Sequence, residues 1–142
     1  MIRKYNATDI NQVLSIWLNA SIKAHDFVAE EFWQSQCENM RNIYIPASET
    51  YVCEKDNAVI GFYSLYENHL AAIFVSPEHQ GNGIGQQLMT HAKQQRNALS
   101  LSVYKQNEAS YQFYLKQGFS VKSEQVDEHT GYMAYSMTFD VK

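Results

Sequence analysis

One stretch of the chain, Leu70 to Met89, constrains the fold more than any other. It reads as a buried strand, a turn at Ser76-Pro77, a glycine-rich loop and the start of a helix. Glycines at the alternate positions 81, 83 and 85 let the loop backbone turn sharply and approach a ligand without Cβ atoms in the way. Because the free N–H groups at a helix N-terminus favour an anion, the stretch predicts a strand–loop–helix junction that binds phosphate.

Two better-known phosphate loops do not fit this stretch. A nucleotide-binding P-loop needs Lys and then Ser or Thr after its last glycine, whereas Gln86 and Gln87 follow Gly85. A dinucleotide fingerprint needs G-x-G-x-x-G, whereas the spacing from Gly81 is G-x-G-x-G. The alternative to a ligand loop is a plain strand-to-helix connection in which the glycines serve only for turning.

Length and charge limit the class of protein. A chain of 142 residues can bury one sizeable core, so we expect a single domain over residues 1–142. The net charge is -4, and Lys and Arg do not cluster, which argues against nucleic acid because neutralising phosphates needs clustered cations. A mildly acidic surface instead favours a cationic partner such as an amine.

The sequence also carries no signal for membrane insertion or for an oxidising compartment. The N-terminus lacks an apolar leader, and no run approaches the roughly 18 apolar residues of a membrane span, so we expect a cytoplasmic protein with no membrane partner. Cys37 and Cys53 are single and widely spaced, which favours buried or idle thiols over a disulfide or a metal site.

Hydrophobic periodicity sets the expected order of elements. Residues 70–75 and 99–104 are strands separated by a helix, so we expect them to be parallel neighbours joined by a right-handed crossover. Thr8 or Asp9 is expected to cap the first helix, and Pro46 to end the second. The other expected strands are 1–5, 50–55, 58–66, 119–126 and 132–139, and the expected helices are 10–24, 29–44, 83–96 and 107–117.

Two segments resemble the signatures of the GNAT superfamily of N-acetyltransferases. Residues 80–85 match Q-x-x-G-x-G, and residues 107–119 match N-x-x-A-x-x-F-Y-x-x-x-G-F except that Ser110 replaces the usual Ala. The His25-Asp26-Phe27 segment and the short chain further resemble the small bacterial acetyltransferases of the YjaB and YiaC type. The resemblance implies an α/β fold with a mixed, mostly antiparallel sheet, one splayed parallel strand pair and about four helices.

The same resemblance implies that the cosubstrate is acetyl-CoA and that no metal is needed. In this family the pantetheine arm lies between the two parallel strands, which separate at a β-bulge, and the glycine loop holds the pyrophosphate. Backbone groups of Ile73, Phe74 and Val75 would then bind pantetheine, and Asn107 would contact the cofactor, although it is also a natural helix N-cap. The pyrophosphate would be held by Gly81, Asn82, Gly83, Ile84, Gly85 and Gln86.

The resemblance also assigns catalytic candidates. Tyr114 matches the general acid that protonates the departing thiolate, and a phenol with a pKa near 10 can supply that proton at neutral pH. The alternative is an ordinary buried aromatic residue. Some relatives place a basic Glu where this chain has Ser102, so the general base is open among His25, Glu67, His69 and a relay of water molecules. His25 is the lead candidate, although it can equally be a helix cap that bonds a carbonyl.

These inferences predict an N-acetyltransferase in which an amine attacks the thioester directly. The acceptor stays open between a small molecule, a protein lysine and a protein N-terminus, and the protein is expected to be a monomer or homodimer. The alternative is a non-catalytic sensor that binds CoA or acetyl-CoA on the same fold, since Ser102 stands where a basic carboxylate is expected.

Overall fold

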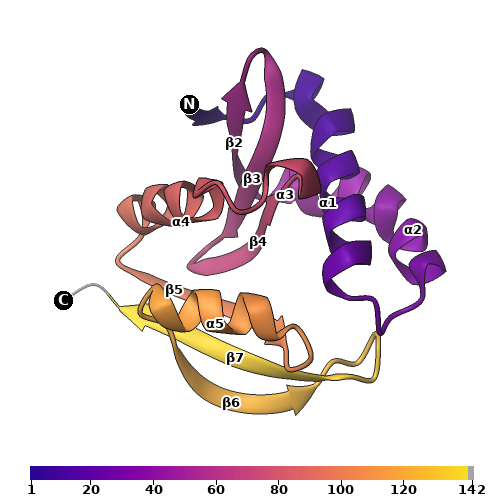
Figure 1. Cartoon of the computed structure of the whole chain (residues 1–142), viewed down its shortest axis with the longest axis vertical. Coiled ribbons are helices and arrows are strands. Elements are labelled where there is room, and N and C mark those ends of the chain that lie inside the picture. The colour runs from indigo at the N-terminus through magenta and orange to yellow at the C-terminus, as the bar shows by residue number, and fades with distance from the viewer. Residues whose placement is uncertain (141–142) are drawn as a thin grey trace.

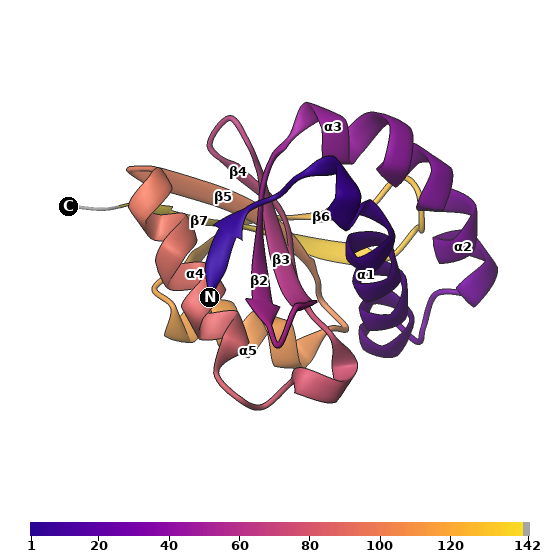
Figure 2. The same cartoon turned by 90° about the horizontal axis from the view of Figure 1, so that it is seen from above.

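A seven-stranded mixed sheet forms the centre of the computed structural model, which describes residues 1–140 (Figures 1 and 2). The spatial order of the strands is β1-β2-β3-β4-β5-β7-β6, and the one parallel pair is β4 and β5. The predicted mostly antiparallel sheet with one parallel pair is therefore confirmed. The strands are β1 (Ile2–Lys4), β2 (Glu49–Lys55), β3 (Ala58–Tyr66), β4 (His69–Val75), β5 (Ala98–Tyr104), β6 (Ser120–Val126) and β7 (Met133–Asp140).

Helices cover both sides of the sheet, so the protein has two apolar cores (Figure 2). On the α1/α2 face, Val13 and Trp17 of α1 pack with Phe62. On the α4/α5 face, Leu88 and Met89 of α4 belong to a core that includes strands from both halves of the sheet, β2–β4 in one half and β5 and β7 in the other. None of the helices within residues 1–140 combines the length and apolarity that a membrane crossing requires. The helices are α1 (Ile10–Ala24), α2 (Glu30–Asn39), α3 (Ile45–Ala47), α4 (Ile84–Gln95) and α5 (Glu108–Lys116).

A bulge in β4 prepares the separation of the two parallel strands. Ser64 pairs with Ala72 and Leu65 pairs with Leu70, so Ala71 is an extra residue in β4 with no partner on β3. Such a bulge bends its strand and interrupts the ladder. The expected bulge is present, and it lies directly after the first residues of β4.

β4 and β5 touch at one end and then diverge. Their ladder consists of the single pair His69 and Ser100, supported by the Ser100 N–H donating to the Asn68 carbonyl at 2.9 Å. Beyond this point β4 continues along β3 and β5 continues along β7. The inner edges of both strands therefore face a gap instead of each other, and the predicted splay is confirmed.

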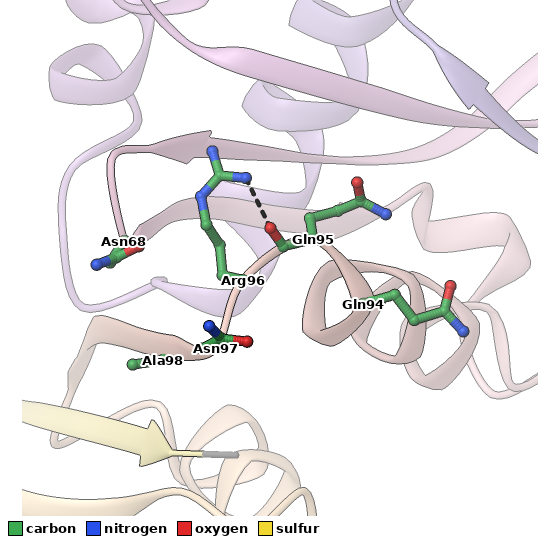
Figure 3. Close-up of a pocket in the computed structure, with 6 residues that line it drawn as sticks. All are labelled: Asn68, Gln94, Gln95, Arg96, Asn97 and Ala98. Atoms are coloured by element: carbon green, nitrogen blue, oxygen red, sulfur yellow. Dashed lines mark hydrogen bonds between the residues drawn. The ribbon is translucent and has the colours of Figure 1, made fainter. Parts of the chain in front are cut away.

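Arg96 holds the closed end of this gap together. Its guanidinium donates to the Glu67 carbonyl at 2.8 Å and to the Glu49 carboxylate at 2.9 Å. It also donates to the Gln95 carbonyl at 3.0 Å, the bond drawn in Figure 3. These bonds join the β3–β4 turn and the start of β2 to the segment between α4 and β5. A polar hollow of about 310 Å³ lies beside them, lined by Asn68, Gln94, Gln95, Arg96, Asn97 and Ala98.

Asp9 occupies the predicted N-cap position of the first helix, but its side chain makes no capping bond to that helix. A short 3₁₀ turn, Ala7–Asp9, precedes α1, and Asn6 caps that turn by accepting the Thr8 N–H at 3.1 Å. The Asp9 carboxylate instead takes two N–H groups of Arg3 at 2.8 and 2.9 Å, and the guanidinium lowers the pKa of that carboxyl. The ion pair ties β1 to the first helix, a contact that helix-capping patterns do not predict.

Pro46 does not end the second helical run. After α2 the chain widens into a π-helical turn, Met40–Tyr44, in which the Ile45 N–H donates to the Met40 carbonyl five residues earlier. Pro46 then lies inside α3. A proline ring collides with the carbonyl four residues earlier in a regular α-helix, and the wider π turn offers a place for it.

Candidate active site

A cleft of about 1080 Å³ occupies the gap between β4 and β5. Its walls come from both sides of the sheet: Ile73 and Tyr114 belong to the α4/α5 core, whereas Phe74 and Trp33 belong to the α1/α2 core. The glycine loop lines one end of the cleft. The cleft therefore passes through the sheet, and two ligands can reach its middle from opposite sides.

The glycine loop presents a row of free backbone donors. In the described chain, none of the N–H groups of residues 81–86 donates to another protein group, and the first internal bond of α4 runs from the Gln87 N–H to the Gly83 carbonyl at 3.1 Å. Gly81 and Gly83 have φ of +84° and +80°, which side chains other than glycine rarely adopt. Free amides at a helix N-terminus suit a diphosphate.

Gly85 differs from the other two glycines of the loop. It lies in the first turn of α4, and a Cβ there would meet the Phe113 ring at 3.6 Å. This is an ordinary van der Waals distance, so neither the space around Gly85 nor its φ requires a glycine, and its predicted place in the pyrophosphate loop stays a prediction.

Two side chains fix the loop to the sheet. The Gln80 side chain donates to the Val75 carbonyl at 3.1 Å, and its own amide oxygen accepts from the Lys23 ammonium at 3.3 Å. The signature glutamine thus fastens the loop at the end of β4. Lys23, which the sequence did not mark, adds a positive charge to this end of the cleft.

Tyr114 lines the cleft from α5 and is only partly exposed. Its ring packs edge-on against Phe113 and Phe119, with centroids 5.6 and 5.9 Å apart. Its hydroxyl has no hydrogen-bond partner among the described residues. Desolvation raises the pKa of this phenol, so it keeps its proton at neutral pH and can donate it.

His25 lies on the other side of the cleft, at the C-terminal end of α1. Its Nε2 accepts from the Asn107 side-chain amide at 3.1 Å, and Asn107 in turn caps α5 by accepting the Ser110 N–H at 3.3 Å. Since Nε2 accepts, the proton of the neutral ring is on Nδ1, which is buried without a partner in the part of the chain described. Burial lowers the pKa of His25 to about 4. As arranged here, His25 has no free lone pair with which to take a proton.

The other base candidates lie elsewhere in the protein. Glu67 is in the β3–β4 turn and His69 begins β4, where its ring bonds Ser100 at 3.0 Å. Both lie at the closed end of the gap, and neither is among the residues that line the cleft. Ser102 is exposed and does line the cleft, and its hydroxyl is a poor proton acceptor at neutral pH.

Several side chains of the α1/α2 side were missed at the sequence level. Trp33, Tyr104 and Asp127 all line the cleft, and the Tyr104 hydroxyl donates to the Asp127 carboxylate at 3.3 Å. Asp127 lies in the β6–β7 turn, and both views show that turn passing beside the connection between α1 and α2 (Figures 1 and 2). Asp127 stands before a Gly-containing turn and Tyr104 ends a strand, but neither pattern indicates a contact between the two.

The described residues fit the expected thioester cosubstrate. The free amides of the glycine loop could hold its diphosphate, and the open edge of β4 offers backbone groups to its amide-containing arm. Val75, Ile84 and Gln86 line the cleft, whereas Asn82 is in the loop between the lining residues Gly81 and Gly83 and is not itself part of the lining. Within residues 1–140 no three His, Cys, Asp or Glu side chains are grouped so as to hold a metal ion, and the thiols of Cys37 and Cys53 are free.

Comparisons with known proteins agree with this geometry. Residues 46–121 match the domain family described as "Acetyltransferase (GNAT) domain". The peptidyl-lysine N-acetyltransferase YiaC of Escherichia coli (strain K12) is 33% identical over 122 residues, which are 85% of this chain and 84% of that protein.

Two solved structures share the fold. The solution structure of apo-form YjaB from Escherichia coli has a TM-score of 0.86 and 26% identity, covering 100% of this chain and 98% of that one. The PaiA N-acetyltransferase of Thermoplasma acidophilum, solved in complex with coenzyme A, has a TM-score of 0.80 and 21% identity, covering 99% and 98%. Both alignments cover nearly the whole of each chain.

Proposed function

Because this chain belongs to the GNAT family of acetyltransferases, we propose that it transfers the acetyl group of acetyl-CoA to the side-chain amine of lysine in peptides or proteins. Its relatives YiaC and YjaB are named peptidyl-lysine N-acetyltransferases, and they share about a third of their residues with it. Of the acceptors considered from the sequence, this similarity favours protein lysine over small amines and N-termini.

The observation that carries the proposal is the passage of one cleft through the sheet. Acetyl-CoA would bind along the α4/α5 side, with its diphosphate on the amides of residues 81–86 and its arm beside Ile73, Phe74 and Val75. The amine would enter from the α1/α2 side. The two substrates then meet in a ternary complex, and direct attack needs no covalent acetyl-enzyme.

Tyr114 is proposed as the general acid. The new bond joins the amine nitrogen to the acetyl carbon, the carbon–sulfur bond breaks, and the departing thiolate takes the phenol proton. The proton that the nitrogen loses on becoming an amide returns through water to the phenolate, which restores Tyr114. A phenol whose pKa is raised by burial holds this proton until sulfur charge develops. Negative charge that develops on the acetyl oxygen would be met by a backbone N–H of β4, for which Val75 is the candidate.

The amine must lose a proton before its lone pair can attack, because an alkylammonium has a pKa near 10.4. We assign this proton to water in the cleft, since the Nε2 lone pair of His25 is occupied by Asn107. His25 then acts as a positioning residue. It links the end of α1 to the N-terminus of α5, the helix that carries Tyr114.

The test is acetyl transfer by the purified protein. Acetyl-CoA is mixed with peptides that hold one lysine and a blocked N-terminus, and free thiol and acetylated peptide are measured together. We expect product on the lysine peptides, and none on matched peptides with norleucine in place of lysine. Equal rates with and without protein across the panel would refute the proposal.

A further inference from the structure

Positive and negative groups are distributed unevenly along the cleft. Lys23 and the free amides lie at the glycine loop, whereas the carboxylates of Asp26, Glu108 and Asp127 line the part away from it. Asp26 follows His25 and Glu108 follows Asn107, and the side chains of His25 and Asn107 are hydrogen-bonded. A negative region beside the entry from the α1/α2 side favours a cationic ligand.

Asp127 is the best placed of the three carboxylates. Its Oδ1 accepts the N–H groups of His129 at 2.8 Å and Thr130 at 3.1 Å, which fixes the side chain. Among residues 1–140, its Oδ2 accepts from the Tyr104 hydroxyl alone, at the long distance of 3.3 Å. A carboxylate oxygen can accept two hydrogen bonds, so Oδ2 has capacity for one more donor. Asp26, by contrast, is exposed and has no such support.

An aromatic wall leads to this carboxylate. The ring of Tyr104 lies 5.0 Å from that of His25 and 6.5 Å from that of Trp33, and all three residues line the cleft. Such rings pack well against a methylene chain and attract a cation through their faces. The wall is long and apolar enough for the stem of an unbranched alkyl amine.

The same wall holds two donors that lack partners. His25 and Trp33 are 9% and 7% exposed, and in the described chain neither the Nδ1 of His25 nor the Nε1 of Trp33 has a hydrogen-bond acceptor. Leaving a buried donor unpaired costs about 1–3 kcal/mol, so such groups mark a place that a ligand oxygen would complete. A peptide supplies carbonyl oxygens, whereas a free polyamine does not.

We infer that Asp127, fixed by the backbone N–H groups of His129 and Thr130, is the counter-ion for the ammonium group of a peptide lysine whose stem lies against Trp33 and Tyr104. This inference rests on the proposed function, since it names the residue that selects the acceptor of the same site. Asp127 binds the amine in its charged form before the proton is lost. Tyr104 is a positioning residue that keeps Oδ2 directed at the cleft.

Asp127→Asn tests the inference with the turn kept intact. The amide oxygen of Asn can still accept the N–H groups of His129 and Thr130, while the negative charge is removed. Loss of a hydrogen bond to a charged group should raise KM for a lysine peptide about tenfold, with KM for acetyl-CoA unchanged. Glu128→Gln is the matched control, because it removes an exposed charge from the same turn and should change neither constant.

A binding measurement keeps the test independent of turnover. A lysine peptide, its norleucine counterpart and cadaverine are titrated into the CoA-saturated wild-type protein and into Asp127→Asn. We expect the wild type to prefer the lysine peptide over the norleucine peptide about tenfold and the variant to lose that preference. Cadaverine, which has the ammonium and stem but no peptide carbonyl, should bind the wild type more weakly than the lysine peptide.

The outcomes separate this inference from the proposed function. Acetyl transfer to lysine with identical behaviour of the two variants would overturn the role of Asp127 and leave the function standing. A lysine preference that depends on Asp127 without any acetyl transfer would support the site and refute the function. Equal binding of cadaverine and peptide, or no peptide binding by the wild type, would overturn the inference.

Discussion

The two faces of the sheet meet the same cleft by different means. The α4/α5 face offers backbone amides of residues 81–86, the open edge of β4 and the hydroxyl of Tyr114. The α1/α2 face offers side chains: Trp33 and His25 from the helices, Tyr104 from β5 and Asp127 from a distant turn. The first face is built for a ligand with a constant chemical form, and the second can be altered one side chain at a time. This difference suits a constant acetyl donor and an acceptor that varies between relatives. We therefore call the α4/α5 face the donor face and the α1/α2 face the acceptor face.

The largest expected effect concerns Tyr114, the proposed general acid on the α4/α5 face. Tyr114→Phe should lower kcat for lysine peptides by about 10²- to 10⁴-fold, because the departing thiolate loses its proton donor. The dissociation constant of acetyl-CoA should stay within about twofold of wild type, because the ring is kept. Single-turnover rates and calorimetric titration measure the two quantities.

Tyr111→Phe is the control for that variant. Tyr111 is on the same helix, but its ring packs on Tyr135 with centroids 4.7 Å apart, away from the cleft. It should keep wild-type kcat. If Tyr114→Phe also turns over at the wild-type rate, the donor face carries no general acid.

The next effect tests how the acceptor face is held together. The folded state resists protonation of His25 because burial lowers its pKa from 6.5 to about 4, whereas the unfolded chain protonates it near 6.5. The contribution of neutral His25 to the free energy of unfolding is therefore fully present above pH 6.5 and decreases as the pH falls towards 4. At pH 5 the loss of unfolding free energy should be about 2 kcal/mol relative to pH 7.5.

His25→Gln removes this titration while keeping an oxygen that can accept from Asn107. Urea unfolding at pH 7.5 and pH 5 should show a smaller loss for the variant than for the wild type. Some pH dependence will stay, because burial also lowers the pKa of His69 and His91. Parallel pH dependence in the two proteins would mean that His25 is not buried in its neutral form.

A smaller effect is expected at Gly83, where two matched substitutions distinguish the cost of backbone strain from the loss of cosubstrate binding. Gly83→Val and Gly131→Val place a branched residue at nearly the same φ, +80° and +79°, and both sites have open space around the new Cβ. Each should lose about 1–2 kcal/mol of stability. Only Gly83→Val should also weaken acetyl-CoA binding, by about tenfold, because its side chain enters the space beside the free amides. Equal affinities for acetyl-CoA in the two variants would make the loop a simple connector.

The smallest effect is expected at Ser102. This residue is exposed in the cleft on β5, where some relatives carry a basic carboxylate, and Ser102→Ala removes only a hydroxyl. We expect kcat/KM within about threefold of wild type and an unchanged pH–rate profile. A large drop in rate would give the acceptor face a catalytic group that the proposal does not include.

Much of the fold was predictable because its signals are local. The Asp56-Asn57 turn with φ of +53° and +66° is the expected hairpin, and the helix from residue 84 starts directly after the predicted loop. The cap at Asn6 and the helical turn through Pro46 were mispredicted. At the first place, the Asp9 carboxylate accepts from Arg3 and does not cap α1. At the second, a π turn accommodates the proline ring within the helical run.

The sequence by itself determined the donor side of this protein. Glycines, a helix N-terminus and the order of strand, loop and helix are properties of neighbouring residues, so a phosphate-binding loop at residues 80–86 could be predicted from them, and the resemblance to GNAT signatures added Tyr114 as a candidate. Only the tertiary structure decided the acceptor side. His25 meets Asn107 across 82 positions and Tyr104 meets Asp127 across 23, and such contacts depend on how the whole sheet twists and splays. No local pattern encodes that geometry, which is why the chemistry of the donor could be predicted from the sequence and the chemistry of the acceptor required the fold.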